Sequence, residues 1–175
     1  MGGTVAGGVA LYGALSSLSG TGTVNLDPVV LRGQSANDVI NAIVEATQPI
    51  DGTLDAEARR SSSAEALAEL LKNYPDADLF KLTEEQKLAV VETYVANDVF
   101  HRIDLDLGKT LQDNAPSIVT AMARHEEIRN YVREAVADSF RRLKAAGQAL
   151  TRHSMTQIIG AAISETFIVF EGYLK

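Results

Sequence analysis

The chain has 175 residues, 46% of them hydrophobic and 22% charged, a composition that fits a single soluble globular domain and excludes a disordered chain. The absence of cysteine excludes disulfides, thiol nucleophiles and cysteine-ligated zinc. The formal net charge is −7, so the chain lacks the basic surface on which nucleic-acid affinity depends. We therefore expect no direct nucleic-acid ligand, and a basic or neutral protein partner remains open.

Residues 1–24 are rich in glycine and carry no charged side chain. Glycine, serine, threonine and asparagine make up 14 of the first 26 residues, which is too polar for a membrane span. Gly3 and Gly7 lie four residues apart, so a helix here would allow close backbone approach, seated by Val5, Val9, Leu11, Leu15 and Leu18. Glycines directly after Met1 suggest a segment continuing from a missing upstream region. We therefore separate residues 1–24 from a helical bundle domain over residues 25–175.

Two helices are expected next. Ser35 is an N-cap for a helix that stops before Pro49, with apolar residues at Val39, Ile40, Ile43 and Val44. Thr53 can cap a second helix over residues 54–73, in which three consecutive serines at 61–63 predict a kink or a split. Its inward side chains are expected to be Leu54, Ala58, Ala66, Leu67, Leu70 and Leu71.

Thr83 and Gln86 form a predicted capping box at the start of a strongly amphipathic helix. Its apolar side chains recur every three or four residues, at Leu88, Val91, Val95, Val99 and Ile103. The order Gly108, Lys109, Thr110 matches the end of a phosphate-binding loop, but Ile103 stands where that loop needs its first glycine. We therefore interpret Gly108 as the end of the helix, followed by a loop.

Two further helices complete the expected fold. Pro116 suits the first position of a long helix ending at Gly147, and a last helix from about 151 to 173 is apolar around much of its circumference. Such a helix is either central to the bundle or faces a partner. No strand pattern is visible, so the predicted fold is an all-α, single-domain bundle of five or six helices. The inward residues of the long helix are expected to be Ile118, Met122, Ile128, Val132, Val136, Phe140 and Leu143.

The motifs that suggest catalysis are incomplete. His125 and Glu126 begin like a zinc-protease helix, but Arg129 stands where the second histidine ligand belongs. His101 and Asp104 could form an acid–base pair at i, i+3, although a surface pair is the commoner outcome. We therefore predict no catalytic, metal-binding or cofactor-binding residue, and no cofactor.

Candidate partner-binding residues lie on the last two helices. Asp138 can reach both Arg141 and Arg142, which is typical of a salt-bridged exposed face; the alternative is a docking face, because arginine often anchors interfaces. The expected partner-binding residues are Arg141, Arg142, Phe167, Phe170 and Tyr173.

Four parts of the chain carry a family resemblance: AGGVALYGALSSL, GQSANDVINAIVEATQPIDGTLDAEARRSSSAEAL, LTEEQKLAVVETYVANDVFHRIDLDLGKTL and the two closing helices. In this order they resemble the C-terminal domain of the QatB family of the Qat anti-phage defence system. The resemblance implies a cytoplasmic bacterial protein encoded beside an ATPase, a QueC-like enzyme and a TatD-like nuclease. In that family the helical domain follows a long N-terminal region rich in Gly, Ser and Pro, and the family implies a non-enzymatic scaffold or a substrate modified by the QueC-like enzyme.

The expected function is therefore an interaction or scaffold component of an anti-phage complex, with the other Qat components as partners, no membrane and self-association left open. Two alternatives remain. One is an enzyme with an unrecognised acid–base pair such as His101 and Asp104. The other is a membrane-associating effector that uses the glycine-rich start.

Overall fold

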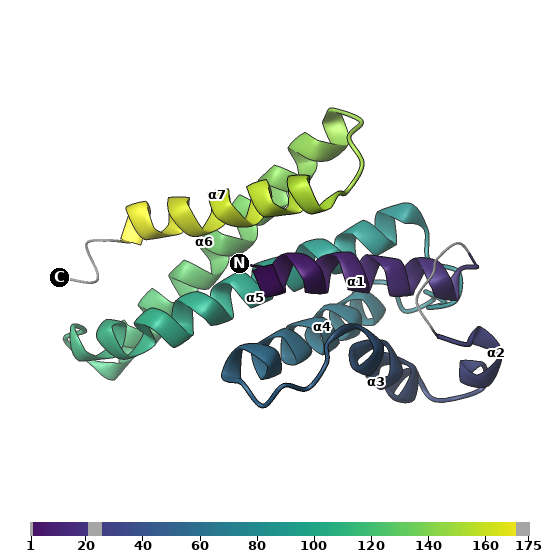
Figure 1. The fold of residues 1–175 in the computed structure, drawn as a ribbon. Coiled ribbons are helices and arrows are strands. Elements are labelled where there is room, and N and C mark those ends of the chain that lie inside the picture. The colour runs from purple at the N-terminus through teal and green to yellow at the C-terminus, as the bar shows by residue number, and fades with distance from the viewer. Residues whose placement is uncertain (1, 21–25, 171–175) are drawn as a thin grey trace.

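Seven helices make up the part of the chain that the computed structural model describes, which is residues 2–20 and 26–170 apart from the side chain of Arg152 (Figure 1). These residues contain no strand, which confirms the all-α prediction. The count exceeds five or six because a four-residue helix follows Asp27, whose side chain accepts a hydrogen bond from the Val29 N–H. The helices are α1 Gly2–Leu18, α2 Pro28–Leu31, α3 Ala36–Thr47, α4 Leu54–Asn73, α5 Glu84–Asp113, α6 Ile118–Ala145 and α7 Arg152–Phe170.

The 30-residue helix α5 is the axis of the bundle, since it contacts α1, α4, α6 and α7. Helices α3 and α4 lie on one side of it and α6 and α7 on the other, with α1 contacting both groups (Figure 1). The C-terminal part of α5 extends beyond α1, α3 and α4 and forms a hairpin with the start of α6 (Figure 1). This hairpin end is where the candidate site lies.

The predicted helix starts are confirmed by their caps. Ser35 and Thr53 each accept a hydrogen bond from a backbone N–H of the first turn, and Thr83 and Gln86 form the full capping box. Gly147 follows the end of α6 with φ of +62°, a conformation that glycine adopts at low cost.

Helix α4 corrects two predictions. It is continuous through the three serines, because the Ser62 hydroxyl donates to the carbonyl of Ala58 and the small side chains of Ser62 and Ser63 are buried. Leu54, expected to face inward, is 74% exposed, because it is the first residue of the helix and lies outside the contact with α5.

The hairpin between α5 and α6 corrects three further predictions. Helix α5 continues through Gly108 to Asp113, so no loop exists there, and α6 is capped by Ser117 rather than opened by Pro116. Ile118 and Met122 are 80% and 68% exposed although the apolar stripe of α6 predicted them inside. The stripe is buried only from Ile128 onward, where α6 meets α7 as well as α5; the remaining predicted members, Val132, Val136, Phe140 and Leu143, are buried there.

Helix α1 packs as closely as its glycines predict. A Cβ at Gly3 would come within 2.7 Å of the Arg59 guanidinium, and one at Gly7 would collide with the Tyr94 hydroxyl. Leu11 and Leu15 are fully buried in the main core. Residues 2–18 of the glycine-rich stretch therefore form a tightly packed helix of the bundle, and residues 1 and 21–24 lie outside the described residues.

Helix α7 lies at the edge of the bundle. One stripe is buried against α6, α1 and α5, while Ile168 and Val169 are 72% and 52% exposed. None of the helices described, α1 and α7 included, combines the length and apolar character that crossing a membrane requires. The buried side chains of α7 are Met155, Ile158, Ile159, Ala162, Thr166 and Phe170.

Candidate interaction site

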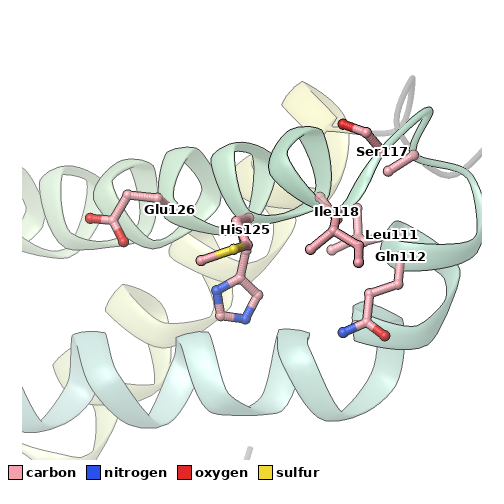
Figure 2. A pocket seen from close by; sticks show the side chains of 10 residues that line it. Leu111, Gln112, Ser117, Ile118, His125 and Glu126 are labelled. Carbon is pink, nitrogen blue, oxygen red and sulfur yellow. The ribbon is translucent and has the colours of Figure 1, made fainter.

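A pocket of about 750 Å³ opens between the C-terminal part of α5 and the N-terminal part of α6 (Figure 2). We call it the α5–α6 pocket. Its volume lies within the range of roughly 300–1,000 Å³ that is usual for ligand sites. It is lined by Gly108, Leu111, Gln112, Ala115, Ser117, Ile118, Ala121, Met122, His125 and Glu126.

The pocket exists because small residues face large, uncovered ones across the two helices. Gly108 has no side chain to fill the space, and a Cβ there would meet only the carboxylate of Asp104, at 2.6 Å. On α6, Ile118 and Met122 line the pocket where the two helices approach their connecting turn, and both are exposed. The wall is consequently apolar and open to solvent.

A histidine–carboxylate pair lies along this wall. The Nε2 atom of His125 is 2.8 Å from Oδ1 of Asp104 on α5. The His125 ring also packs edge-on against Phe100, with centroids 4.7 Å apart, and the Arg129 guanidinium lies over the Phe100 ring, 5.1 Å from its centroid. These contacts fix the imidazole ring between the helices and hold the hairpin together.

This pairing differs from the acid–base pair considered from the sequence. Asp104 bonds His125 across the helix interface, whereas the Nδ1 atom of His101 lies 3.0 Å from the hydroxyl of Ser62 on α4. His101 and Asp104 therefore serve two different helix contacts. Of the two histidines, His125 is the one that lines the α5–α6 pocket.

The two helix segments that flank the pocket carry more acidic than basic side chains, and one of the acidic side chains, Glu126, lines the pocket. Residues 104–127 contain five carboxylates, at 104, 106, 113, 126 and 127, and two basic side chains, Lys109 and Arg124. Arg124 donates a hydrogen bond to the Asn114 carbonyl, at the end of α5. Glu126 lines the pocket at the end opposite Gln112 and Ser117 (Figure 2) and accepts a hydrogen bond only from Asn130, at 3.4 Å, among the contacts described.

Exposed apolar side chains gather at the same end of the molecule. The C-terminal end of α7 packs there against α5 and α6, around a small cavity that includes Leu107, Ile128 and Phe167. Of the eleven large hydrophobic residues that are exposed in the described chain, six belong to this end. They are Leu105, Ile118, Val119, Met122, Ile168 and Val169.

Arg141 and Arg142, predicted from the sequence as partner-binding, lie near the opposite end of α6. Both are exposed and both pair with Asp138, at 3.4 and 2.9 Å. Arg142 also lines a shallower pocket of about 350 Å³ between α6 and α7. Arg141 is close enough to the half-buried Glu92 to oppose the rise that burial causes in the pKa of that carboxyl.

The predicted aromatic residues lie elsewhere. Phe170 is 7% exposed and packs edge-on against Tyr131, with centroids 5.4 Å apart, while Phe167 is half-buried against the core. Tyr173 lies outside the described residues. Because α6 rises about 1.5 Å per residue, the region of Ile128 beside Phe167 is about 20 Å from Arg141, so the structure does not bring the arginines and the aromatic residues together.

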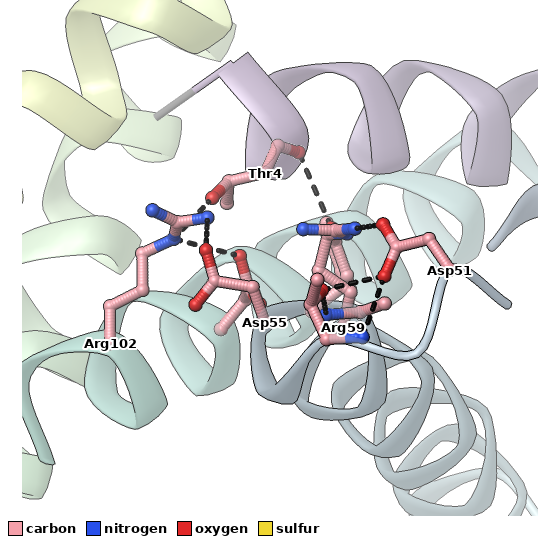
Figure 3. A network of polar contacts seen from close by, with 9 residues as sticks. Thr4, Asp51, Asp55, Arg59 and Arg102 are labelled. Carbon is pink, nitrogen blue, oxygen red and sulfur yellow. Dashed lines mark hydrogen bonds and ion pairs between the residues drawn. The ribbon is translucent and has the colours of Figure 1, made fainter. Parts of the chain in front are cut away.

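A second polar cluster lies beneath α1, where it joins α1, α4 and α5 (Figure 3). Arg102 contacts Thr4 at 3.1 Å, Asp55 at 3.3 Å and the buried Asp98 at 3.8 Å. Burial raises the pKa of Asp98, although Thr4 and Arg102 oppose the rise. Burial also raises the pKa of the Tyr94 hydroxyl, which donates to the Thr4 carbonyl. The cluster is covered by α1.

Sequence reasoning missed the α5–α6 pocket although its signals were present. A glycine inside a helix is unfavourable by about 1 kcal/mol relative to alanine, so Gly108 within a helix indicates a packing or functional reason. Met122 and His125 lie three residues apart and therefore share a face of α6 with Ile118. The misplaced end of α5 concealed that Gly108 faces them.

The chain matches a known protein family over most of its length. The family model described as Qat anti-phage system associated protein QatB matches residues 1–170 of the 175. No curated protein and no solved structure matches the chain.

Proposed function

The chain belongs to the QatB family of Qat anti-phage system associated proteins and is thus a component of an anti-phage defence system; from this premise we propose that it acts as a non-enzymatic interaction component. Its partners are the other Qat components, namely the QueC-like enzyme, the ATPase and the TatD-like nuclease implied by the resemblance, in the bacterial cytoplasm. The observation that carries the proposal is the concentration of exposed apolar side chains at the α5–α6–α7 end.

The surface chemistry supports an interaction role. Apolar side chains exposed together on a folded domain are typical of surfaces that bind other proteins. Met122 and Ile118 present flexible and branched apolar groups beside the α5–α6 pocket, whereas the buried apolar side chains form one continuous core. Met in particular is enriched at protein interfaces.

Co-purification tests this proposal. Cells that express the complete operon, with an affinity tag on this chain, should yield at least one other Qat component in stoichiometric amount, and deletion of the chain should abolish phage resistance. If the tagged chain elutes alone and the deletion strain resists phage normally, the proposal is wrong.

A second candidate, an acid–base enzyme, draws on one observation: His125 pairs with Asp104 where it lines a pocket of ligand size. The test is His125→Gln, which keeps a hydrogen-bonding side chain but removes the titratable imidazole. An enzyme that depends on His125 should lose phage resistance while the variant still captures its Qat partners, whereas in an interaction component resistance and partner capture should change together.

A further inference from the structure

The α5–α6 pocket has the features of a docking groove for a helix. Two antiparallel helices flank it, Gly108 opens its floor, and α7 covers a different side of the same hairpin through Phe167 and Phe170. A third helix placed along such a groove would bury apolar anchors at a spacing of three or four residues, as in other helix-in-groove complexes.

The walls determine what kind of anchor fits. Leu111, Ile118 and Met122 supply the apolar surface, and the first of these is buried while the other two are 80% and 68% exposed. Removing apolar surface from water is favourable, so an apolar side chain that covers Met122 and Ile118 gains from both partners. A polar or acidic side chain would gain nothing there.

The rim determines the charge of the occupant. Glu126 lines the pocket. Residues 104–127 contain four other carboxylates and two basic side chains, Lys109 and Arg124. Arg124 donates a hydrogen bond to the carbonyl of Asn114 at the end of α5. Complementary charge favours a basic segment and disfavours an acidic one, including an anionic membrane surface.

From these observations we propose that the α5–α6 pocket binds an amphipathic helical segment of a partner protein, with an apolar side chain seated between Gly108 and Met122 and a lysine or arginine beside Glu126. The inference rests on the proposed interaction function and adds the position and the chemistry of the contact. It places docking at the acidic hairpin and away from Arg141 and Arg142, whose guanidinium groups already pair with Asp138.

Three synthetic helical peptides test the chemistry: one of Leu and Lys in amphipathic spacing, one with Glu in place of every Lys, and one with Ser in place of every Leu. The Leu/Lys peptide should bind the isotopically labelled protein saturably and shift the amide resonances of Gly108, Met122 and Glu126. Equal shifts with the Leu/Glu or the Ser/Lys peptide, or saturable shifts confined to other regions, would contradict the proposal.

Two substitutions locate the contact. Met122→Asp should weaken binding of the Leu/Lys peptide by about tenfold or more, and Glu126→Lys should weaken it by several-fold, since a truncated or reversed anchor typically costs more than 1 kcal/mol. The matched controls are Val29→Asp on α2, where Val29 is 79% exposed, and Glu45→Lys on the exposed face of α3. Circular dichroism should show that all four variants remain folded. A control substitution that weakens binding as much as Met122→Asp would overturn the assignment.

The same variants in the complete operon separate this inference from the proposed function. If the wild-type chain captures no Qat component, the proposed function fails. If the wild-type chain and Met122→Asp capture the same components equally, the interaction function stands and the pocket inference fails. If sedimentation shows that Met122→Asp changes only self-association, the occupant is a second copy of the chain, which also contradicts the proposal.

Discussion

The polar cluster beneath α1, which we call the junction, and the α5–α6 pocket both contain glycines within helices. The glycines of the two regions have opposite effects. At the junction, Gly7 lets α1 approach the Tyr94 hydroxyl and the Gln48 amide so closely that an added Cβ would collide with both, and Gly3 lies against the end of the Arg59 side chain. At the pocket, Gly108 faces only the carboxylate of its own helix neighbour Asp104, and the space beside it stays open. Other helices of the same chain cover the surface of α1 around Gly3 and Gly7, whereas the space beside Gly108 is open to solvent.

The two regions differ in how much they contribute to the stability of the isolated chain. The junction places the buried Asp98, and Arg102 beside it, under a covering helix, where an imperfect fit costs stability. The hairpin end leaves apolar groups such as Ile118 in solvent, where they contribute little to the stability of the isolated chain. Stability is therefore concentrated in the junction and the core, and the capacity for binding at the hairpin end.

The largest expected contrast in unfolding free energy is between a core leucine of α1 and a methionine of the α5–α6 pocket. Leu15→Ala should lower the free energy of unfolding by about 2–5 kcal/mol, because Leu15 is fully buried and its truncation leaves a cavity. Met122→Ala should change it by no more than about 0.5 kcal/mol. Urea denaturation followed by circular dichroism measures both. Equal losses would mean that Met122 is a core residue.

The next contrast uses the glycines themselves. Gly7→Ala should destabilise the fold by about 1–3 kcal/mol, since the added methyl group collides with the Tyr94 hydroxyl and the Gln48 amide. Gly160→Ala on α7 is the control, because nothing lies within 4 Å of its Cβ position, and helix propensity should stabilise it by up to about 1 kcal/mol. Thermal unfolding of both variants checks the prediction, and a stabilising Gly7→Ala would refute the close packing of α1.

A pH-dependent contrast sharpens the account of the buried cluster. Because burial raises the pKa of Asp98 in the folded state, the folded state binds this proton more tightly than the unfolded state does. The contribution of Asp98 is thus most favourable when the carboxyl is protonated, and it is lost as the pH rises from about 4 through the raised pKa.

Asp98→Asn tests this directly. Its stability relative to the wild type should increase between about pH 4 and pH 7, and the Arg102, Arg59 and His101 side chains near it reduce but do not reverse the trend. Denaturation at several pH values measures the difference. A constant or falling difference would show that the neighbouring cations outweigh burial.

The smallest expected effect is at the pocket glycine. Gly108→Ala should gain helix propensity but displace the Asp104 carboxylate from His125, and these opposing changes should leave stability within about 1 kcal/mol of the wild type. Because the added methyl group also fills the floor of the α5–α6 pocket, peptide binding should fall more than stability does. Thermal unfolding beside a peptide titration makes the comparison, which fails if binding is unchanged.

Much of the architecture follows from local rules in the sequence. The caps at Ser35, Thr53 and Thr83 and the glycine after α6 are short-range signals, so the starts of α3, α4 and α5 and the end of α6 could be predicted, whereas the start of α6 was wrong. The continuity of α4 could not, because it depends on the burial of Ser62 against α5, a contact between distant segments.

The candidate site was harder to predict for the same reason. The pairing of His125 with Asp104 joins two helices, and no spacing within one helix reveals it. The apolar stripe of α6 correctly marked a face, but the stripe is buried only from Ile128 onward, where α6 also meets α7, and Ile118 and Met122 are exposed. Periodicity identifies faces of helices, and only packing identifies which faces remain open.

Hydrogen exchange of this chain, alone and in the purified complex with its Qat partners, tests most directly the claim that the acidic hairpin is the docking surface. Residues 104–126 should exchange more slowly in the complex, while the amides of α1, already packed in the isolated chain, should change little. Slowed exchange confined to α1 or to the Arg141–Arg142 end of α6, with residues 104–126 unchanged, would contradict the account.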